Sequence, residues 1–197
     1  MLPLLKAVSL ALFLELALAF PSMREPMIVH ERRDTVTSRF AQNGPAPNDQ
    51  LLDLRIALVQ SDRPGLEKTL MDVSTPGNPQ YGKFLSKEEV EAFVAPSPAT
   101  FSAVTKFLAD NGINASNVTS AGDMLSIRIP VQQANSLFDT QFHSFTDLSN
   151  GKACVRTLSY SIPAVLQSHV DYVGPTIMCV QDMPYRLPIR ILTTSTL

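Results

Sequence analysis

Three acidic residues, Glu88, Glu89 and Glu91, form the densest group of potential acid–base side chains in the chain. Paired carboxylates act as general acid and general base only when both reach the same substrate. On a helix, Glu88 and Glu91 share an outer face, while Val90 and Phe93 take the inner one. The spacing therefore predicts a solvated helix surface rather than a catalytic pair.

The histidines and cysteines are few and scattered. His30, His143 and His169 are far apart in the sequence, and for His169 we prefer a hydrogen bond to local backbone over a role as a pH sensor. Cys154 and Cys179 either pair in an oxidising compartment or remain two buried thiols. Their spacing and the lack of companion ligands argue against a zinc site.

Other catalytic motifs are missing from the sequence. It contains no Gly-x-Ser-x-Gly, no His-Glu-x-x-His and no glycine-rich loop that would hold a phosphate. We therefore expect a chain that is not an enzyme and has no cofactor-binding, metal-binding or catalytic residues.

Length and composition fit one globular domain. The chain has 197 residues, of which 45% are apolar, so it can bury one substantial core. The formal net charge is −2, and no basic patch is interleaved with aromatic residues. This composition gives no electrostatic support for nucleic-acid binding, which we therefore set aside.

The N-terminus has the pattern of a secretory signal peptide over residues 1–19. Lys6 supplies the positive charge, residues 7–18 are apolar, and Ala19 ends a small-residue cleavage site. Glu15 weakens membrane insertion, and the apolar stretch is shorter than the ~20 residues that a spanning helix needs. We expect a secreted, extracellular protein with no membrane association after the signal is removed.

Two further features concern the secretory pathway. Asn114 and Asn117 each begin an Asn-x-Ser/Thr triplet and are candidate glycosylation sites in a loop. Residues 20–49 are polar and irregular and are expected to be a flexible leader. Within them, Arg32 and Arg33 are either a dibasic processing site or a solvated charge pair.

Beyond residue 50, hydrophobic periodicity predicts alternating strands and helices. Leu52, Leu54, Ile56 and Leu58 alternate as in a strand with one buried face. The expected strands cover residues 51–60, 118–121, 124–129, 141–146, 153–160 and 170–173, and the expected helices cover residues 64–73, 87–94, 99–110, 131–138 and 163–169. This order predicts an α+β fold with a ferredoxin-like antiparallel sheet and helices packed on one face.

One loop between two of these helices carries an unusual string of turn and cap residues. Ser86 with Glu89 three residues later predicts a capping box, and Ser97 before Pro98 predicts the start of the next helix. The string contains Asn78, Pro79, Tyr81, Gly82, Leu85 and Ser86. A second block near the end of the domain contains Arg156, Tyr160, Pro163, His169, Asp171 and Pro175.

These two blocks, in this order, resemble the activation domain of the sedolisins, the serine-carboxyl peptidases that include kumamolisin and fungal tripeptidyl peptidases. The likeness covers residues 50–176, and residues 177–197 are left as an irregular tail. Sedolisins use a Ser, Glu and Asp set with the serine in Gly-Thr-Ser, a motif that this chain lacks. The resemblance thus implies a propeptide without its catalytic domain.

By analogy with the family, such a domain binds its catalytic domain, helps it to fold, inhibits it and leaves in acid. The partner is in cis in the family and would be in trans here. Two alternatives remain open. One is a secreted ferredoxin-like binding module unrelated to proteolysis, and the other is a fragment of a full-length tripeptidyl-peptidase zymogen.

Acid release calls for carboxylates, because a carboxylate paired across the interface loses its contribution when it is protonated. Weakening a nanomolar complex to micromolar requires about 4 kcal/mol. A carboxylate whose pKa is shifted by one unit supplies about 1.4 kcal/mol, so roughly three such carboxylates are enough. The candidates are Asp139, Asp147, Asp171 and Asp182.

Overall fold

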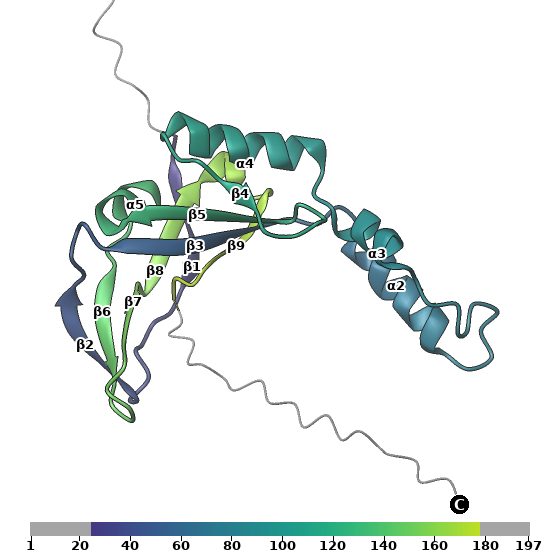
Figure 1. Cartoon of the computed structure of the whole chain (residues 1–197), viewed down its shortest axis with the longest axis horizontal. Coiled ribbons are helices and arrows are strands. Elements are labelled where there is room, and N and C mark those ends of the chain that lie inside the picture. The colour runs from purple at the N-terminus through teal and green to yellow at the C-terminus, as the bar shows by residue number, and fades with distance from the viewer. Residues whose placement is uncertain (1–24, 178–197) are drawn as a thin grey trace, which may run out of the picture.

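A computed structural model describes residues 25–177 (Figure 1). Its centre is an antiparallel four-stranded sheet with the spatial order β4–β5–β3–β9. The strands are β3 (Leu51–Leu58), β4 (Ser116–Asn117), β5 (Met124–Pro130) and β9 (Val170–Gly174). Numbered along the chain as first to fourth, they lie in the order 4-1-3-2. This is the ferredoxin-like arrangement, so the predicted fold class is confirmed.

The last strand of this sheet is not the one that the sequence suggested. The stretch 141–146 was expected to complete the sheet, but β6 (His143–Asp147) pairs elsewhere and β9 takes the place beside β3. The periodicity of a short strand specifies a buried face but not the neighbouring strand, which explains the error.

Strand β3 shows why the sheet has one covered face. Its residues Leu52, Leu54 and Ile56 are buried, whereas Asp53 and Arg55 point the other way and are exposed. The predicted alternation is confirmed, and it divides the sheet into a core face and an opposite face. In Figure 1, β3 and β5 lie in front of β1 and β8, so the viewer looks onto the face opposite the core.

Two helices cover the core face. Helix α4 (Pro98–Asp110) starts at the N-cap Ser97, as predicted, and buries Val104 and Leu108. Helix α5 (Val131–Leu137) lies directly after β5 and contributes fully buried side chains. Both belong with the sheet residues to one hydrophobic core.

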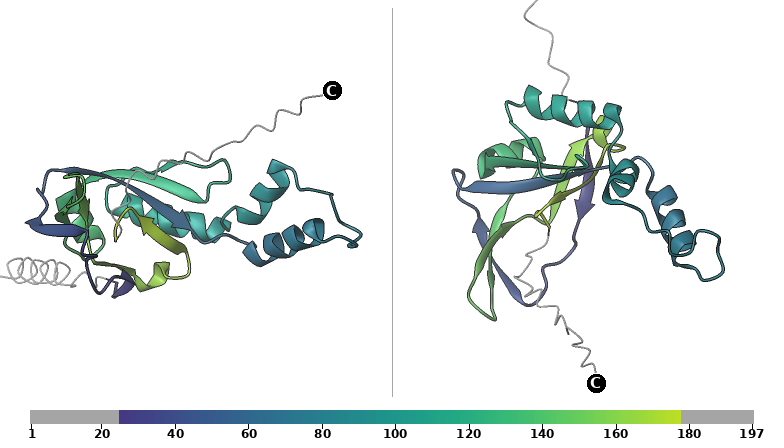
Figure 2. Two further views of the ribbon diagram at one scale, coloured as in Figure 1. Left: turned by 90° about the horizontal axis from the view of Figure 1, so that it is seen from below. Right: turned by 45° about the vertical axis from the view of Figure 1, so that its right-hand side comes forward.

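The other two helices lie away from the sheet. Helices α2 (Arg63–Ser74) and α3 (Lys87–Val94) pack on each other and project from the end of β3 (Figure 2). The core cluster contains no residue between Leu58 and Ala103. We call residues 63–94 the arm. Leu70 of α2 is 58% exposed, because α2 has only α3 to pack against.

Residues 20–49 were expected to be a flexible leader, and this is wrong for two segments. β1 (Met27–Arg32) pairs with β8 (Ser159–Pro163), and β2 (Phe40–Pro45) pairs with β6. Each of the two pairings contains a register shift. Gly44 and Pro45 resemble loop residues in the sequence, but a sheet edge with a bulge accepts both.

The expected strand 153–160 divides into two. β7 (Ala153–Arg156) pairs with β6 in the three-stranded sheet β2–β6–β7, and β8 pairs with β1. The chain turns between them at Thr157, whose N–H donates to the carbonyl of Thr176. A short 3-10 helix, η1 (Ala164–Leu166), replaces the expected helix 163–169.

Tyr160 joins three strands at the base of the core. Its hydroxyl donates to the Glu31 carboxylate in β1 (2.7 Å) and accepts from the Val173 N–H in β9 (2.8 Å). Its ring packs edge-on against Phe138, with centroids 6.0 Å apart. Burial and the bond to Glu31 raise the pKa of Tyr160, so the hydroxyl stays protonated and keeps donating.

This network predicts the effect of removing one oxygen atom. Tyr160→Phe leaves the buried Val173 N–H without its acceptor and Glu31 without its donor, so unfolding should become easier by about 1–3 kcal/mol. Urea denaturation followed by circular dichroism measures the change. Tyr172→Phe, at a partly exposed tyrosine outside the network, is the control. Equal denaturation midpoints for Tyr160→Phe and the parent would contradict this account.

Candidate functional site

The first block of motif residues lies at the tip of the arm. Asn78 organises this loop: its side-chain amide donates to Asp72 (3.0 Å), and its side-chain oxygen accepts from the N–H of Gln80 (2.9 Å). The N–H of Gly82 donates to the carbonyl of Val73 (2.9 Å). Gly82 has a φ of 77°, a left-handed conformation that favours glycine. The tip is therefore tied to the end of α2.

The loop enters α3 through the predicted capping box. The N–H of Glu89 donates to the Ser86 hydroxyl, and the N–H of Ser86 donates to the Glu89 carboxylate (2.7 Å). Of the other two acidic residues, Glu88 is exposed and Glu91 accepts from Ser120 and Lys87. Glu89 and Glu91 make separate local contacts, and the three carboxylates do not converge on one site.

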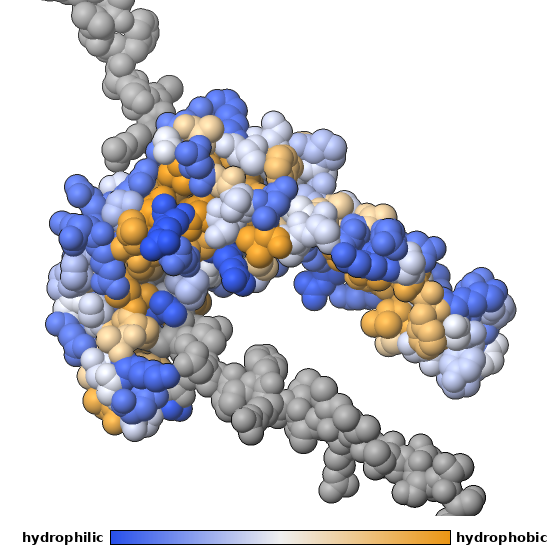
Figure 3. Space-filling view, viewed as in Figure 1, coloured by the Kyte–Doolittle hydropathy of each residue, from blue (hydrophilic) through white to orange (hydrophobic). Residues whose placement is uncertain are grey.

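Four large apolar side chains of the arm are exposed. Their exposed fractions are 58% for Leu70, 68% for Met71, 56% for Tyr81 and 75% for Phe84. We call these four residues the arm patch. Figure 3 shows apolar surface on the arm beyond a polar stretch. The sequence predicted exposure for none of the four, because hydrophobic periodicity does not show what covers an apolar side chain.

The base of the arm is fixed to the body. Gln60 donates to Asp123 (3.0 Å), next to the turn between β4 and β5, and Ser120 of the same turn donates to Glu91 of α3. The hydrogen bond from Ser120 lowers the pKa of Glu91, outweighing the effect of burial. These contacts give the arm a defined direction from the body.

A second uncovered region is the face of the four-stranded sheet opposite the core. Leu51, Asp53 and Arg55 of β3, Arg128 of β5 and Tyr172 of β9 are exposed there, and we call this surface the open face. Arg128 and Asp53 form a solvent-exposed ion pair (3.6 Å). The open face therefore carries both charged and apolar side chains.

The second motif block lies in the body and does not meet the first. Tyr160 and Pro163 are buried in β8, and His169 is hydrogen-bonded through Nδ1 to the Thr100 hydroxyl of α4 (3.0 Å) rather than to local backbone. Asp171 is exposed and accepts from His30 through its carbonyl (2.9 Å), and Pro175 follows a cis peptide bond. Tyr160, His169 and Asp171 of this block thus each connect separate elements of the body.

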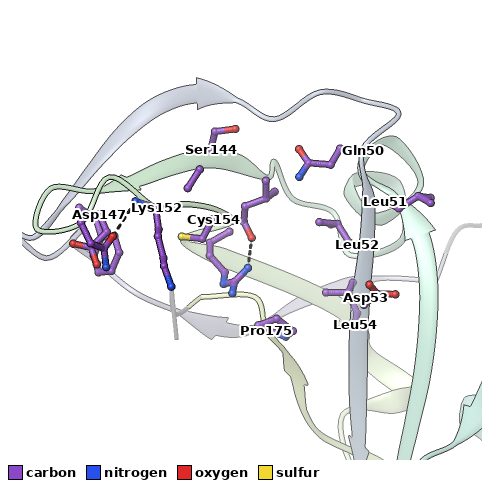
Figure 4. A pocket seen from close by; sticks show the side chains of 15 residues that line it. Gln50, Leu51, Leu52, Asp53, Leu54, Ser144, Asp147, Lys152, Cys154 and Pro175 are labelled. Carbon is purple, nitrogen blue, oxygen red and sulfur yellow. Dashed lines mark hydrogen bonds between the residues drawn. The ribbon is translucent and has the colours of Figure 1, made fainter. Parts of the chain in front are cut away.

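Arg156, the remaining residue of that block, lines a cavity of about 540 Å³ between β3 and the β6–β7 hairpin (Figure 4). Burial lowers the pKa of Arg156, and its guanidinium donates to the carbonyl of Val155. Cys154 also lines the cavity and is disulfide-bonded. The other cysteine in the sequence, Cys179, lies outside the described residues.

Asp147, at the end of β6, holds the β6–β7 turn. Its carboxylate accepts from Arg39 (3.1 Å) and from the N–H and hydroxyl of Ser149 (2.9 and 2.7 Å). Burial alone would raise the pKa of Asp147, but these bonds outweigh it and hold the pKa at about 2. One of its two oxygens is buried and has no hydrogen-bond partner.

These findings reorder the candidate acid triggers. Asp147 is buried and serves a turn, so it is not a surface trigger. Asp139 and Asp171 are exposed, whereas Asp182 lies outside the described residues. Asn114 and Asn117 are both exposed, Asn114 after α4 and Asn117 in the edge strand β4, where glycans have room.

Residues 25–177 contain no cluster of three or more histidine, cysteine or acidic side chains able to hold a metal ion. Over the same residues, no helix combines the length and hydropathy needed to cross a membrane.

Comparison with known proteins gives one family model and several relatives, which agree with each other. A family model described as "Pro-kumamolisin, activation domain" matches residues 38–179. "Probable tripeptidyl-peptidase SED4" of Trichophyton verrucosum is 37% identical over 149 residues, which are 75% of this chain and 25% of that protein. "Aorsin" of Aspergillus oryzae is 36% identical over 151 residues, 75% of this chain and 23% of that protein. The chain thus spans about a quarter of the length of these relatives.

The environment of Asp147 predicts a specific pH dependence of stability. Because its pKa falls from 3.8 in the unfolded chain to about 2 in the folded one, its contribution is complete above pH 3.8 and is lost as the pH falls towards 2. Asp147→Asn should remove this part of the stability curve between pH 4 and pH 2. Urea midpoints over this range measure it, with Asp49→Asn at an exposed position as the control. Parallel curves for Asp147→Asn and the parent would refute it.

The disulfide of Cys154 leads to a further prediction. Digestion without reduction should release one peptide pair that joins Cys154 to Cys179, because the sequence has only these two cysteines. Mass spectrometry before and after reduction detects the pair. Alkylation of both thiols in unreduced protein, or a covalent dimer, would contradict the prediction.

Proposed function

Because the chain belongs to the pro-kumamolisin activation domain family, we propose that it binds the catalytic domain of a sedolisin-type peptidase as a folding aid and inhibitor. The observation that carries the proposal is the half-covered sheet. One face packs on α4 and α5, while the open face presents apolar and charged side chains to solvent. A partner that covers this face would complete the layered arrangement.

The chemistry of the open face supports docking to a folded surface rather than capture of a small molecule. Leu51 and Tyr172 are 51% and 40% exposed and can bury apolar area, while Asp53, Arg55 and Arg128 can set orientation. Charged groups at the rim of an interface contribute mainly to association rate and specificity. The proposed partner is in cis in a longer polypeptide or in trans as a separate peptidase.

We further propose that acid releases the partner through exposed carboxylates. A carboxylate that gains a cationic partner on binding has a lower pKa in the complex, so its contribution is present at neutral pH and lost as acid protonates it. Asp53 and Asp171 are exposed on strands of the open sheet and are suited to this role, whereas Asp139 is exposed beside α4, away from the open face. Asp147 is excluded because it is committed to Arg39 and Ser149.

The cellular setting forms part of the proposal. Residues 1–19 would direct the chain into the secretory pathway, where Asn114 and Asn117 would accept glycans and Cys154 would be oxidised. The activation domain proposed for residues 50–176 would include β1 and β2 as well, because these strands complete the pairing of β8 and β6.

Inhibition tests the proposal directly. The full chain in excess should slow peptide cleavage by the mature form of a relative, such as the tripeptidyl-peptidase SED4, near neutral pH and less so in acid. Arg55→Glu, in the centre of the open face, should weaken inhibition about tenfold or more, since like charges across an interface cost several kcal/mol. Lys106→Glu, an equal charge reversal on the exposed side of α4, should inhibit like the parent. Cleavage rates unaffected by the parent chain would overturn the proposal.

A further inference from the structure

The arm patch is presented by a structure that is already ordered. The tip loop is held by Asn78 and Gly82, α2 is stabilised by the ion pair between Lys68 and Asp72 (2.8 Å), and α3 by its capping box. Binding through such a surface loses little conformational entropy, because the loop does not have to be ordered at that moment.

The arm contributes nothing to the hydrophobic core, yet it exposes large side chains. Tyr81 and Phe84 are 56% and 75% exposed at the tip, and Leu70 and Met71 are exposed on α2, to whose end the tip loop is hydrogen-bonded. Aromatic residues on a rigid support are the usual anchors of protein interfaces. The hydrogen bonds of the tip loop do not involve the side chains of Tyr81 and Phe84, so polar residues at these two positions would allow the same loop. The fold of the arm therefore does not explain why these two side chains are apolar.

The arm lies where a partner seated on the open face would reach it. The eight-residue strand β3 is about 26 Å long. The unmatched three-quarters of the SED4 relative amounts to roughly 450 residues, which as one globular body has a radius of gyration of about 22 Å. Such a body is wider than the sheet and overhangs its end. The arm projects from that end, and its apolar surface is visible from the same side as the open face (Figure 3).

Interface size points the same way. A stable interface buries about 800 Å² on each partner. The open face offers mostly charged and half-exposed side chains, whereas two buried aromatic side chains alone add roughly 150–250 Å² each. The arm and the open face together reach this area more readily than either does alone.

We propose that the arm patch is a second docking element, which binds the catalytic domain of a sedolisin-type peptidase beyond the edge of the open face. This inference rests on the proposed function. Tyr81 and Phe84 are its anchors, and Leu70 and Met71 on α2 add further apolar area. The occupant is an apolar depression on the peptidase surface rather than its substrate cleft, since the patch offers no extended strand that could imitate a substrate.

The test compares affinities of full-length chains for the mature SED4 relative by biolayer interferometry near neutral pH. The double variant Tyr81→Ala/Phe84→Ala should bind about 30-fold more weakly, the loss expected for a hot spot. Phe84→Leu should retain most of the affinity, because it keeps an apolar side chain. Val165→Ala, which removes an equally exposed apolar side chain beside α4, should bind like the parent.

Each outcome decides a separate question. If the parent binds and the double variant binds equally well, the inference is overturned and the proposed function stands. If the parent itself does not bind, both are overturned. If the double variant changes the oligomeric state in light scattering and not the affinity, the patch joins copies of this chain and the inference is wrong. Thermal denaturation confirms that the variants are folded, as expected for exposed positions.

Discussion

The hydroxyl of Tyr160 is the contact on which the body of the domain depends. It links the paired strands β1 and β8 to β9, which belongs to a different sheet, through Glu31 and the Val173 N–H. Because β9 is the edge strand beside β3, this contact fixes the two-stranded β1–β8 ribbon beneath the central sheet. The ribbon closes the core on one side, which leaves the opposite face of the sheet uncovered. The surface available to a partner is thus a consequence of how the core is closed.

The internal electrostatics suit a domain that remains folded while its surface titrates. The pKa of Asp147 is held at about 2, and the hydrogen bond to Lys68 lowers the pKa of Asp72 in the arm. Both side chains therefore keep their hydrogen bonds in mild acid. The side chains of exposed carboxylates such as Asp171 are not held by hydrogen bonds of this kind within the domain. Acid can then weaken an interface before it unfolds the domain, which separates release from denaturation.

Local sequence signals predicted where helices and strands occur better than they predicted which strands pair with each other. The capping box at Ser86, the N-cap at Ser97 and the alternation in β3 depend on nearby residues, and all three are as expected. β1 and β2 were missed because their pairing depends on strands about a hundred residues or more away, and Gly44 and Pro45 suggest a loop. The exposure of Leu70 was not predictable, because periodicity shows that a helix has an apolar side but not what covers it. For the same reason, the motif at the arm tip could be identified in the sequence, but its location in the fold could not be predicted.

In the complex proposed above, a peptidase catalytic domain docks across the open face and onto the arm. The decisive measurement is a crystal structure of this chain bound to the mature part of a sedolisin-type relative. We expect contacts at Arg55 and Tyr172 on the sheet and at Tyr81 and Phe84 on the arm, with α4 facing solvent. A complex in which the peptidase sits against α4 and η1, leaving the sheet and the arm uncovered, would contradict it.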